Sequence, residues 1–215
     1  PETITLPPRK ATRAGRCQVL VVGGGPAGIG AALGAAQAGA DTVLVERYGF
    51  LGGNATAALV MPWMSFYTQR GSVADRISTS LMPSDHPPGE PVVGGALATI
   101  LERLYANHGA VPPSLDTGFT VPFDPEVLKV TLQQSLDEAG VRILLHAFAS
   151  GVTGAPGRPT GVVFETKSGP VVVEADVIVD CTGDGDIAAL SGCPYEIGRE
   201  EDGLTQPMTL MFRLV

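Results

Sequence analysis

Three glycines and one acid have the types and spacing needed to bind a dinucleotide. Gly23, Gly25 and Gly28 form a G-x-G-x-x-G motif, and Glu46 follows 18 residues after the last glycine. In such a motif the first glycine permits a tight turn, the second lets the backbone approach a pyrophosphate, and the third lets a helix touch a strand. The acid accepts hydrogen bonds from both ribose hydroxyls, and its charge disfavours a 2′-phosphate by like-charge repulsion. The spacing therefore predicts a dinucleotide site.

The segments around this motif have the order strand, turn, helix, strand. CQVLVV (17–22) and DTVLVER (41–47) are apolar runs typical of buried strands, and the small residues of 29–40 favour a helix that packs closely on a sheet. Pro26 and Ala27 come just before it, where a helix N-terminus presents free amide groups to an anion. Parallel strands joined by a helix are covered on both faces. We therefore predict an α/β fold with a Rossmann-like domain, a parallel sheet with covering helices.

A membrane helix is the alternative for the same stretch. The 24 residues between Arg16 and Asp41 carry no charge, and roughly 20 apolar residues are enough to span a bilayer. However, the run Gly23-Gly24-Gly25-Pro26 would break such a helix. We therefore expect no membrane span.

The overall charge and the cysteines exclude further classes of protein. Lys and Arg number 14 against 22 Asp and Glu, a net charge of −8, so nucleic acid is not expected as a partner. The three cysteines are far apart and form no C-x-x-C pair, which argues against a disulfide framework and against a metal site. The first 16 residues contain no apolar segment typical of a secretory signal. A reducing, cytoplasmic setting is the simplest expectation.

The rest of the chain predicts an irregular segment, two helices and further strands. Residues 48–93 show no sustained period; their aromatic and Met content indicates order in the first half, and 72–90 fits a mobile loop. Asp124 as N-cap and Pro125 at the first position begin a helix that stops at Gly140. VRILLHAF (141–148) predicts a strand, 161–175 a β-hairpin around Lys-Ser-Gly, and 176–186 one more buried strand ending in a glycine-rich loop. Residues 95–110 predict an amphipathic helix, whose apolar face consists of Leu97, Ile100, Leu101 and Leu104. The apolar face predicted for the helix after Asp124 consists of Val127, Val130, Leu132 and Leu136.

The segment around the glycine motif resembles the N-terminus of FAD-dependent oxidoreductases of the glutathione-reductase-like flavoprotein group. The resemblance lies in VLVVGGGPAGIGAALGAAQAGADTVLVER, followed by YGFLGGNAT. The resemblance implies that the motif holds the ADP half of FAD, and that Gly52 and Gly53 let the chain run beside the ribityl and flavin part. It places Arg47 near the adenosine, with a solvated surface charge as the alternative. Asn54 and Thr56 would reach the flavin ring as hydrogen-bond partners. The other interpretation of the glycine doublet is an ordinary turn.

VIVDCTGDGDIAAL is similar to the later FAD-contacting strand and loop of this group. The resemblance implies that Thr182 and Gly183 lie against the cofactor, while Asp184 contacts it or caps the following helix. Cys181 replaces the usual alanine, which we interpret as packing. In relatives the chain after the VRILLHAF strand faces adenine through backbone groups, which would place Phe148 or Ala149 there.

Together with FDPEVLKVTLQQSLDEAGVRILLH, these segments are similar to the family called simply FAD-dependent oxidoreductases, and the resemblance covers nearly all of Cys17 to Arg213. It implies an FAD-binding domain at 17–56 and 114–190 after an N-terminal arm at 1–16. Residues 57–113 would form an insertion facing substrate. Residues 191–215 would begin a substrate domain, with MTLMFRLV as its first strand. The closing C-terminal segment of such flavoproteins is missing, so we expect a companion chain, from cleavage or from a second subunit, in a hetero-oligomer.

These observations predict an FAD-dependent oxidoreductase that transfers a hydride equivalent between a small organic substrate and FAD. No catalytic residue is identified, because the flavin carries the chemistry and because His86, His108 and His146, the last within the VRILLHAF strand, are isolated. The alternatives are an NAD-binding oxidoreductase and a non-catalytic subunit that binds FAD or ADP for assembly. A flavoprotein acting on RNA is disfavoured by the acidic charge. Trp63, Met64, Phe66 and Tyr67 could form the wall of a substrate pocket.

Overall fold

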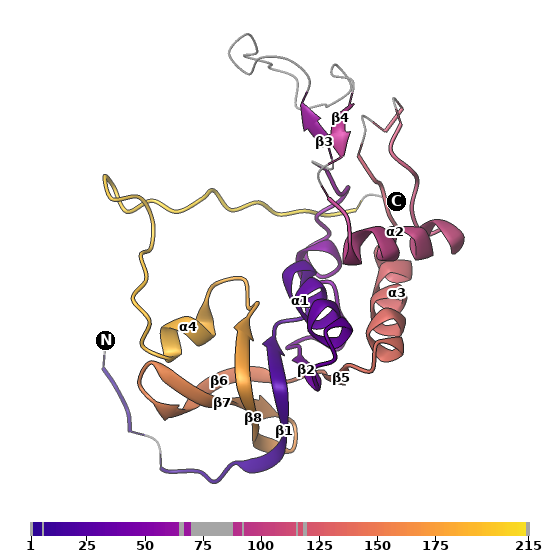
Figure 1. The fold of residues 1–215 in the computed structure, drawn as a ribbon. Helices are drawn as coiled ribbons and strands as arrows, with labels where there is room; N and C mark the ends of the chain where they lie inside the picture. Colours follow the sequence, from indigo (N-terminus) through magenta and orange to yellow (C-terminus); the bar gives the residue numbers. More distant parts are fainter. Residues whose placement is uncertain are drawn as a thin grey trace. The chain divides into compact units, whose positions relative to one another are not determined.

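The computed structural model describes residues 2–5, 7–64, 67–69, 88–91, 93–114, 116–117 and 120–213. The chain forms two compact units (Figure 1). The first consists of Pro1–Phe50 and Gly140–Pro207, and the second of Leu51–Ala139 and Met208–Val215. Each unit therefore combines segments that are distant in the sequence.

The first unit is built on a six-stranded sheet with the order β5-β2-β1-β8-β7-β6. Its strands are β1 (Thr12–Val22), β2 (Thr42–Val45), β5 (Arg142–Leu144), β6 (Phe148–Ala155), β7 (Arg158–Thr166) and β8 (Gly169–Asp180). The strands β5, β2, β1 and β8 are parallel, whereas β7 and β6 are antiparallel to their neighbours. This mostly parallel sheet, with a meander at one side, confirms the predicted α/β, Rossmann-like class.

Helix α1 (Pro26–Gln37) connects β1 to β2, as predicted. It packs against β1, β2 and β8, and its residues Ile29, Ala32 and Leu33 are buried. Small side chains let the helix approach the strands closely, because little volume separates the two backbones. The helix begins three residues earlier than predicted, at Pro26, so the start of α1 belongs to the glycine motif itself.

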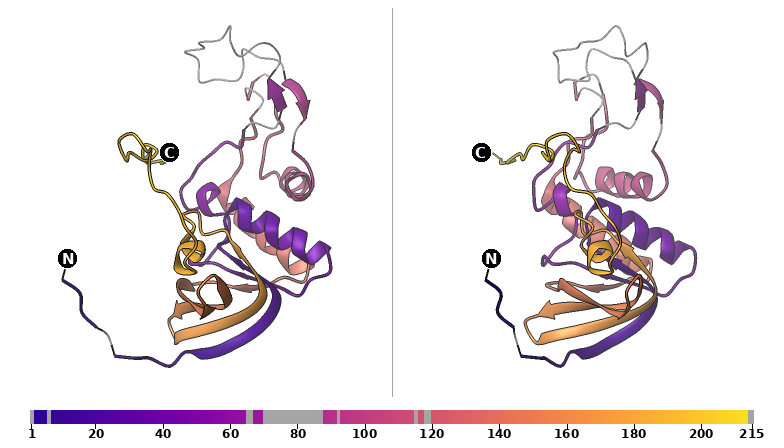
Figure 2. Two further views of the ribbon diagram at one scale, coloured as in Figure 1. Left: turned by 60° about the vertical axis from the view of Figure 1, so that its left-hand side comes forward. Right: turned by 90° about the vertical axis from the view of Figure 1, so that its left-hand side faces the viewer.

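One core cluster joins the meander to the parallel strands. Short helix α4 (Asp186–Leu190) contributes Ile187 to it. Residues in β1, β2, β7 and β8 supply most of the rest, with the largest side chain at Phe164. In both views of Figure 2 the long strands β1 and β8 bend together beside β6 and β7. The apolar contacts thus hold the meander against the strands that end at the glycine motif.

Strand β1 begins at Thr12, inside the segment predicted as a polar arm. Its extra residues pair with β8 from Thr12↔Val171 onward. Basic side chains of this arm form exposed ion pairs with acids of β7 and β8: Arg9–Glu165 at 2.7 Å, Arg13–Glu174 at 2.9 Å and Arg16–Asp176. The sequence pattern missed this extension because the side chains are polar and exposed, while the backbone pairing depends on a strand more than 150 residues away.

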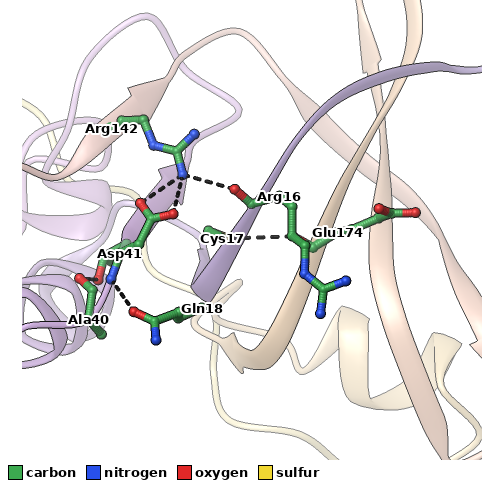
Figure 3. A network of polar contacts seen from close by, with 8 residues as sticks. Arg16, Cys17, Gln18, Ala40, Asp41, Arg142 and Glu174 are labelled. Carbon is green, nitrogen blue, oxygen red and sulfur yellow. Dashed lines mark hydrogen bonds and ion pairs between the residues drawn. The ribbon is translucent and has the colours of Figure 1, made fainter.

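Figure 3 shows the polar network at the point where β1 extends past β2. Arg142 donates to both carboxylate oxygens of Asp41, at 2.8 and 2.9 Å, and to the carbonyl oxygen of Arg16 at 3.0 Å. The amide of Asp41 in turn donates to the Gln18 side chain at 2.8 Å. The Arg16 carbonyl therefore accepts its hydrogen bond from the Arg142 side chain, where a neighbouring strand would otherwise supply the donor. This leaves one fewer free backbone group with which another chain could pair at this edge of β1.

Three predicted strands need correction. The hairpin of β7 and β8 turns at Lys167-Ser168 as expected, but β8 continues to Asp180, so its second strand and the predicted final strand are one. VRILLHAF divides into β5 and the start of β6, because the chain turns at His146, which has φ 55° and lies outside any strand. A non-glycine residue in this left-handed region ends regular strand geometry.

The second unit contains helices α2 (Ala96–Ala106) and α3 (Pro125–Glu138), which pack together. Both were predicted, and Asp124 caps α3 by accepting hydrogen bonds from the amides of Glu126 and Val127. The predicted apolar face of α3 is shifted. Val130 is 57% exposed, and the buried positions are Pro125, Leu128, Thr131, Leu132, Ser135 and Leu136. The polar residues Thr131 and Ser135 are buried in this face because the hydroxyl of each donates to the backbone carbonyl one turn earlier. A pattern of hydrophobic residues does not predict the burial of such polar side chains.

The segment predicted as irregular, 48–93, contains regular elements among its described residues. It contains the short helix η1 (Gly53–Ala55) and the strands β3 (Tyr67–Gln69) and β4 (Pro88–Pro91), which pair with each other. Trp63 forms a bridge with Val121 and its ring lies 4.6 Å from that of Phe123. Trp63 thus packs in the second unit. Phe66, His86 and residues 72–87 of the predicted mobile loop lie outside the described residues, and the end of that predicted loop lies in β4.

The predicted strand MTLMFRLV is not formed in its described part, 208–213, which has no regular secondary structure. Met208 is fully exposed, and Leu210 and Phe212 are 84% and 69% exposed. A strand forms only where another strand satisfies its backbone groups, and these residues have none in the described chain. None of the described helices is both long and apolar enough to cross a membrane.

Candidate functional site

Gly23 and Gly28 are required by close backbone packing. Gly23 has φ 106°, and a Cβ there would lie 2.1 Å from the carbonyl oxygen of Cys181. A Cβ at Gly28 would lie 1.8 Å from the carbonyl oxygen of Gly23. The amide of Gly23 still pairs with the carbonyl of Val45 in β2 at 2.8 Å. The tight turn and the close approach of helix to strand, both expected from the spacing, are present.

The N-terminus of α1 is suited to an anion. Gly25 is the N-cap residue, and Pro26 occupies the first turn beside Ala27. Within the described chain, no side chain caps this helix and its first turn contains no acid. Helix N-terminal amides that no side chain caps attract an external negative charge. Gly25 has an extended backbone, with φ −73°, that any residue could adopt. Glycine is suited to this position because no side chain then separates the backbone from a ligand.

Glu46 joins the glycine loop to the end of β2. Its side chain is 4% exposed, and its Oε2 accepts a hydrogen bond from the Gly24 amide at 2.6 Å. Its Oε1 accepts one from the Tyr48 amide at 2.8 Å. Each carboxylate oxygen keeps further acceptor capacity, since an ionised carboxylate has about four lone-pair sites. Glu46 can therefore hold the loop and still accept hydrogen bonds from ribose hydroxyls.

An aromatic cluster follows Glu46. The guanidinium of Arg47 lies 4.9 Å from the ring centre of Tyr48, and the Tyr48 and Phe50 rings stack with centroids 5.6 Å apart. His146 supports this segment: its amide donates to the Tyr48 carbonyl at 3.1 Å, and its imidazole leaves no room for a Cβ at Gly49. Sequence reasoning missed this use of His146, because nothing in a lone histidine indicates which distant glycine it packs on.

The loop after β8 begins beside the glycine turn. The Cys181 amide donates to the Val22 carbonyl at 2.8 Å. Asp180 Oδ1 accepts from both the amide and the hydroxyl of Thr182, at 3.1 and 2.7 Å, and Oδ2 accepts from the Ala188 amide at 2.9 Å. Burial acts to raise the pKa of Asp180, but the hydrogen bonds from Ala188 and Thr182 outweigh it and hold the pKa below the ordinary value.

Helix α4 is therefore capped differently from the expectation for Asp184. The Thr182 hydroxyl accepts a hydrogen bond from the Asp186 amide at 3.0 Å, and Asp180 accepts the Ala188 amide. Asp184 is exposed. Gly183, also exposed, has φ 94° and open space where its Cβ would be. Asp180 is the functional candidate that the sequence reasoning missed.

The other predicted cofactor contacts fall into two groups. Phe148, 56% exposed, and half-buried Ala149 begin β6 in the same unit as the glycine loop. The remaining predicted residues, Gly52, Gly53, Asn54 and Thr56, belong to the second unit. There Gly52 has φ 111° and no room for a Cβ against Thr56, whose buried hydroxyl donates to the Leu51 carbonyl at 2.7 Å. Asn54 is exposed. Among the described residues, no group of three His, Cys, Asp or Glu side chains is placed to bind a metal.

The sheet, the glycine turn and the buried acid define a dinucleotide-binding protein of the Rossmann-like class. Residues 18–215 match the model of the family described as FAD dependent oxidoreductase, and the chain belongs to this family. Its cofactor is FAD, and the cradle at Gly23 and Gly28, which any side chain would fill, fits the pyrophosphate of such a cofactor.

Two of the proteins that the chain resembles are a thiamine thiazole synthase and a protein of known structure named THI4. The chain is 30% identical over 169 residues to thiamine thiazole synthase of Aeropyrum pernix, which covers 78% of this chain and 55% of that protein. It is 19% identical to the crystal structure of Thermovibrio ammonificans THI4, with a TM-score of 0.50, covering 81% of this chain and 61% of the other. The chain thus spans little more than half of these relatives, and the structural likeness supports the fold.

Proposed function

We propose that the chain is part of an FAD-dependent oxidoreductase that transfers a hydride equivalent between a small organic substrate and FAD. The observation that carries the proposal is the junction of Gly23, Gly28 and Glu46, where two glycines leave room for backbone approach and a buried carboxylate holds the loop. The bound flavin would supply the redox chemistry. The protein residues would bind, orient and shield it.

The roles of the chain's residues follow from their chemistry. The start of α1 would hold the pyrophosphate, Glu46 would accept the ribose hydroxyls, and Arg47 would lie near the adenosine. Phe148 or Ala149 would face the adenine through backbone groups. Thr182, Gly183 and Asp184 would border the cofactor after β8, with Gly52, Gly53, Asn54 and Thr56 at the ribityl and flavin part.

We also propose that the chain belongs to the glutathione-reductase-like group of flavoproteins. A companion polypeptide is a further part of the proposal. The support is a run of exposed apolar side chains at Tyr195, Ile197, Leu204, Met208, Leu210, Met211 and Phe212. Exposed apolar surface of this kind marks interaction sites. We propose that residues 191–215 begin a substrate domain that the companion completes, after the FAD-binding segments 17–56 and 114–190 and the insertion at 57–113. A cytoplasmic setting is proposed from the three free cysteines.

The test is an absorbance spectrum of the purified material, native and denatured, with intact mass spectrometry of every chain in the sample. We expect flavin bands near roughly 370 and 450 nm and a co-purifying second polypeptide. Flavin that stays with the protein on denaturation would indicate a covalent link. A colourless sample that FAD does not restore would contradict the proposal and favour the nicotinamide alternative.

A non-catalytic, FAD-binding assembly subunit is the second candidate. It is favoured by one observation: His146 and Thr56, which could have acted near a cofactor, are engaged in packing and in a backbone hydrogen bond. Anaerobic mixing with candidate organic substrates separates the two functions. Bleaching of the flavin band supports the enzyme, whereas a flavin that dithionite reduces but no substrate does supports the assembly role.

A further inference from the structure

The segment from Thr182 to Ala188 is fixed at both ends by one carboxylate. Asp180 accepts the amide and hydroxyl of Thr182 on one oxygen and the amide of Ala188 on the other. Three donors on a single side chain connect the end of β8, the loop and the first residues of α4. Charge-assisted hydrogen bonds of this kind are stronger than neutral ones.

The hydrogen bonds also determine which group of the loop can meet a ligand. The Thr182 hydroxyl donates to Asp180 and accepts from the Asp186 amide. Both its proton and an acceptor site are therefore occupied within the protein. Gly183 differs: it is exposed, has a positive φ, and has open space on the side where a Cβ would point. The backbone of Gly183 is thus a part of the loop, next to Thr182, that is free to face a cofactor.

The position of Asp180 connects this loop to the glycine turn. Asp180 pairs in register with Val22, the last residue of β1. The next residue, Cys181, donates to the Val22 carbonyl and lies with its own carbonyl against Gly23. Any displacement of the loop at Asp180 would therefore move the surface on which the pyrophosphate-binding turn rests.

We propose that Asp180 is a positioning residue for FAD, which holds the Gly183 backbone and the adjoining glycine turn in their binding geometry without touching the cofactor. This inference rests on the proposed FAD function. The lowered pKa of Asp180 is consistent with it, because the hydrogen bonds favour the ionised carboxylate that accepts all three donors.

The test compares three variants of the chain with the unaltered protein. Asp180→Ala removes every acceptor, and Asp180→Asn keeps one carbonyl oxygen for Thr182 as a partial rescue. Ala189→Gly is the matched control, because Ala189 is an exposed residue of α4 and glycine weakens the helix while leaving the Asp180 hydrogen bonds in place. FAD affinity is measured by quenching of flavin fluorescence, and the environment of bound flavin by visible circular dichroism. Amide exchange at Thr182 and Ala188 is measured without FAD.

We expect Asp180→Ala to weaken FAD binding at least about tenfold and Asp180→Asn to have an intermediate effect, as for loss of hydrogen bonds to a charged group. We expect Ala189→Gly to stay within about twofold of the unaltered chain. Faster exchange at both amides in Asp180→Ala, with an altered flavin dichroism, would support the inference. Unchanged FAD affinity in Asp180→Ala, or an equal loss in Ala189→Gly, would overturn it while leaving the proposed function standing. Failure of the unaltered chain to bind FAD would overturn the proposed function and the role in positioning FAD together.

Discussion

The α-carbon of Gly28 lies so close to Gly23 that a Cβ at position 28 would be 1.8 Å from the Gly23 carbonyl oxygen. The first turn of α1 therefore rests directly on the turn that ends β1. A helix N-terminus can point its amides at a ligand only if the distance between its first turn and the end of the preceding strand is correct. The contact between Gly23 and Gly28 keeps this distance short.

Gly28→Ala is expected to destabilise the chain by about 1–3 kcal/mol, because the added methyl group overpacks a backbone contact that cannot yield. FAD affinity should fall as well, since the helix N-terminus would move. Gly30→Ala is the matched control, two residues further along the same helix, where a Cβ meets nothing within 4 Å. It should stabilise the chain by roughly 0.5–1 kcal/mol. Urea unfolding and FAD titration of both variants provide the measurements, and equal behaviour would show that the Gly28 contact is not tight.

Glu46→Gln is expected to lower the free energy of unfolding by about 1–3 kcal/mol even without FAD. The two buried carboxylate oxygens accept the amides of Gly24 and Tyr48, one each, and glutamine replaces one of these oxygens with an NH2 group, which donates and cannot accept. FAD binding should weaken further through the ribose. Glu201→Gln, at an exposed position of the same unit, is the control and should change neither quantity. If the Glu46→Gln chain were as stable as the unaltered chain but bound FAD more weakly, Glu46 would contribute to ribose binding and not to the stability of the loop.

The glycine motif was predictable because its requirement is local. Gly23, Gly28 and Glu46 lie in one strand-helix-strand unit, where chain geometry fixes what must be small and what must accept hydrogen bonds. The N-cap at Asp124 was predictable for the same reason, since its partners are two and three residues away.

The features that escaped prediction depend on distant partners. The use of Asp180 follows from its register opposite Val22 and from the turn that brings Ala188 back to it. His146 combines a left-handed backbone with a ring that packs on Gly49, nearly one hundred residues earlier in the sequence. The strand predicted for MTLMFRLV (208–215) had the right residue types, but strand formation needs a paired neighbour, which its described part, 208–213, does not have.

Asp124→Ala is expected to cost about 1 kcal/mol in the stability of the second unit, because the amides of Glu126 and Val127 lose their acceptor. Asp137→Ala, in the last turn of the same helix, is the control. It removes a negative charge near the negative end of the helix dipole and should be neutral or slightly stabilising. Chemical unfolding, with amide exchange at Glu126 and Val127, checks both. Exchange that speeds up equally in the two variants would argue against the cap.

The three free cysteines should react in a fixed order with an alkylating agent. Burial raises the pKa of Cys17, outweighing the opposing effect of Arg142, and burial together with the charge of Asp180 raises the pKa of Cys181. Because the thiolate is the reacting form, a raised pKa leaves less of it at neutral pH. Cys193 is exposed and should be labelled first. Intact mass spectrometry at pH 7 and pH 9 measures the rates: labelling of Cys17 and Cys181 should lag at pH 7 and increase at pH 9. In urea the three rates should converge. Labelling of Cys17 as fast as Cys193 in the folded chain would contradict its burial in the core cluster, where its thiol donates to the Glu174 carbonyl in the neighbouring strand β8.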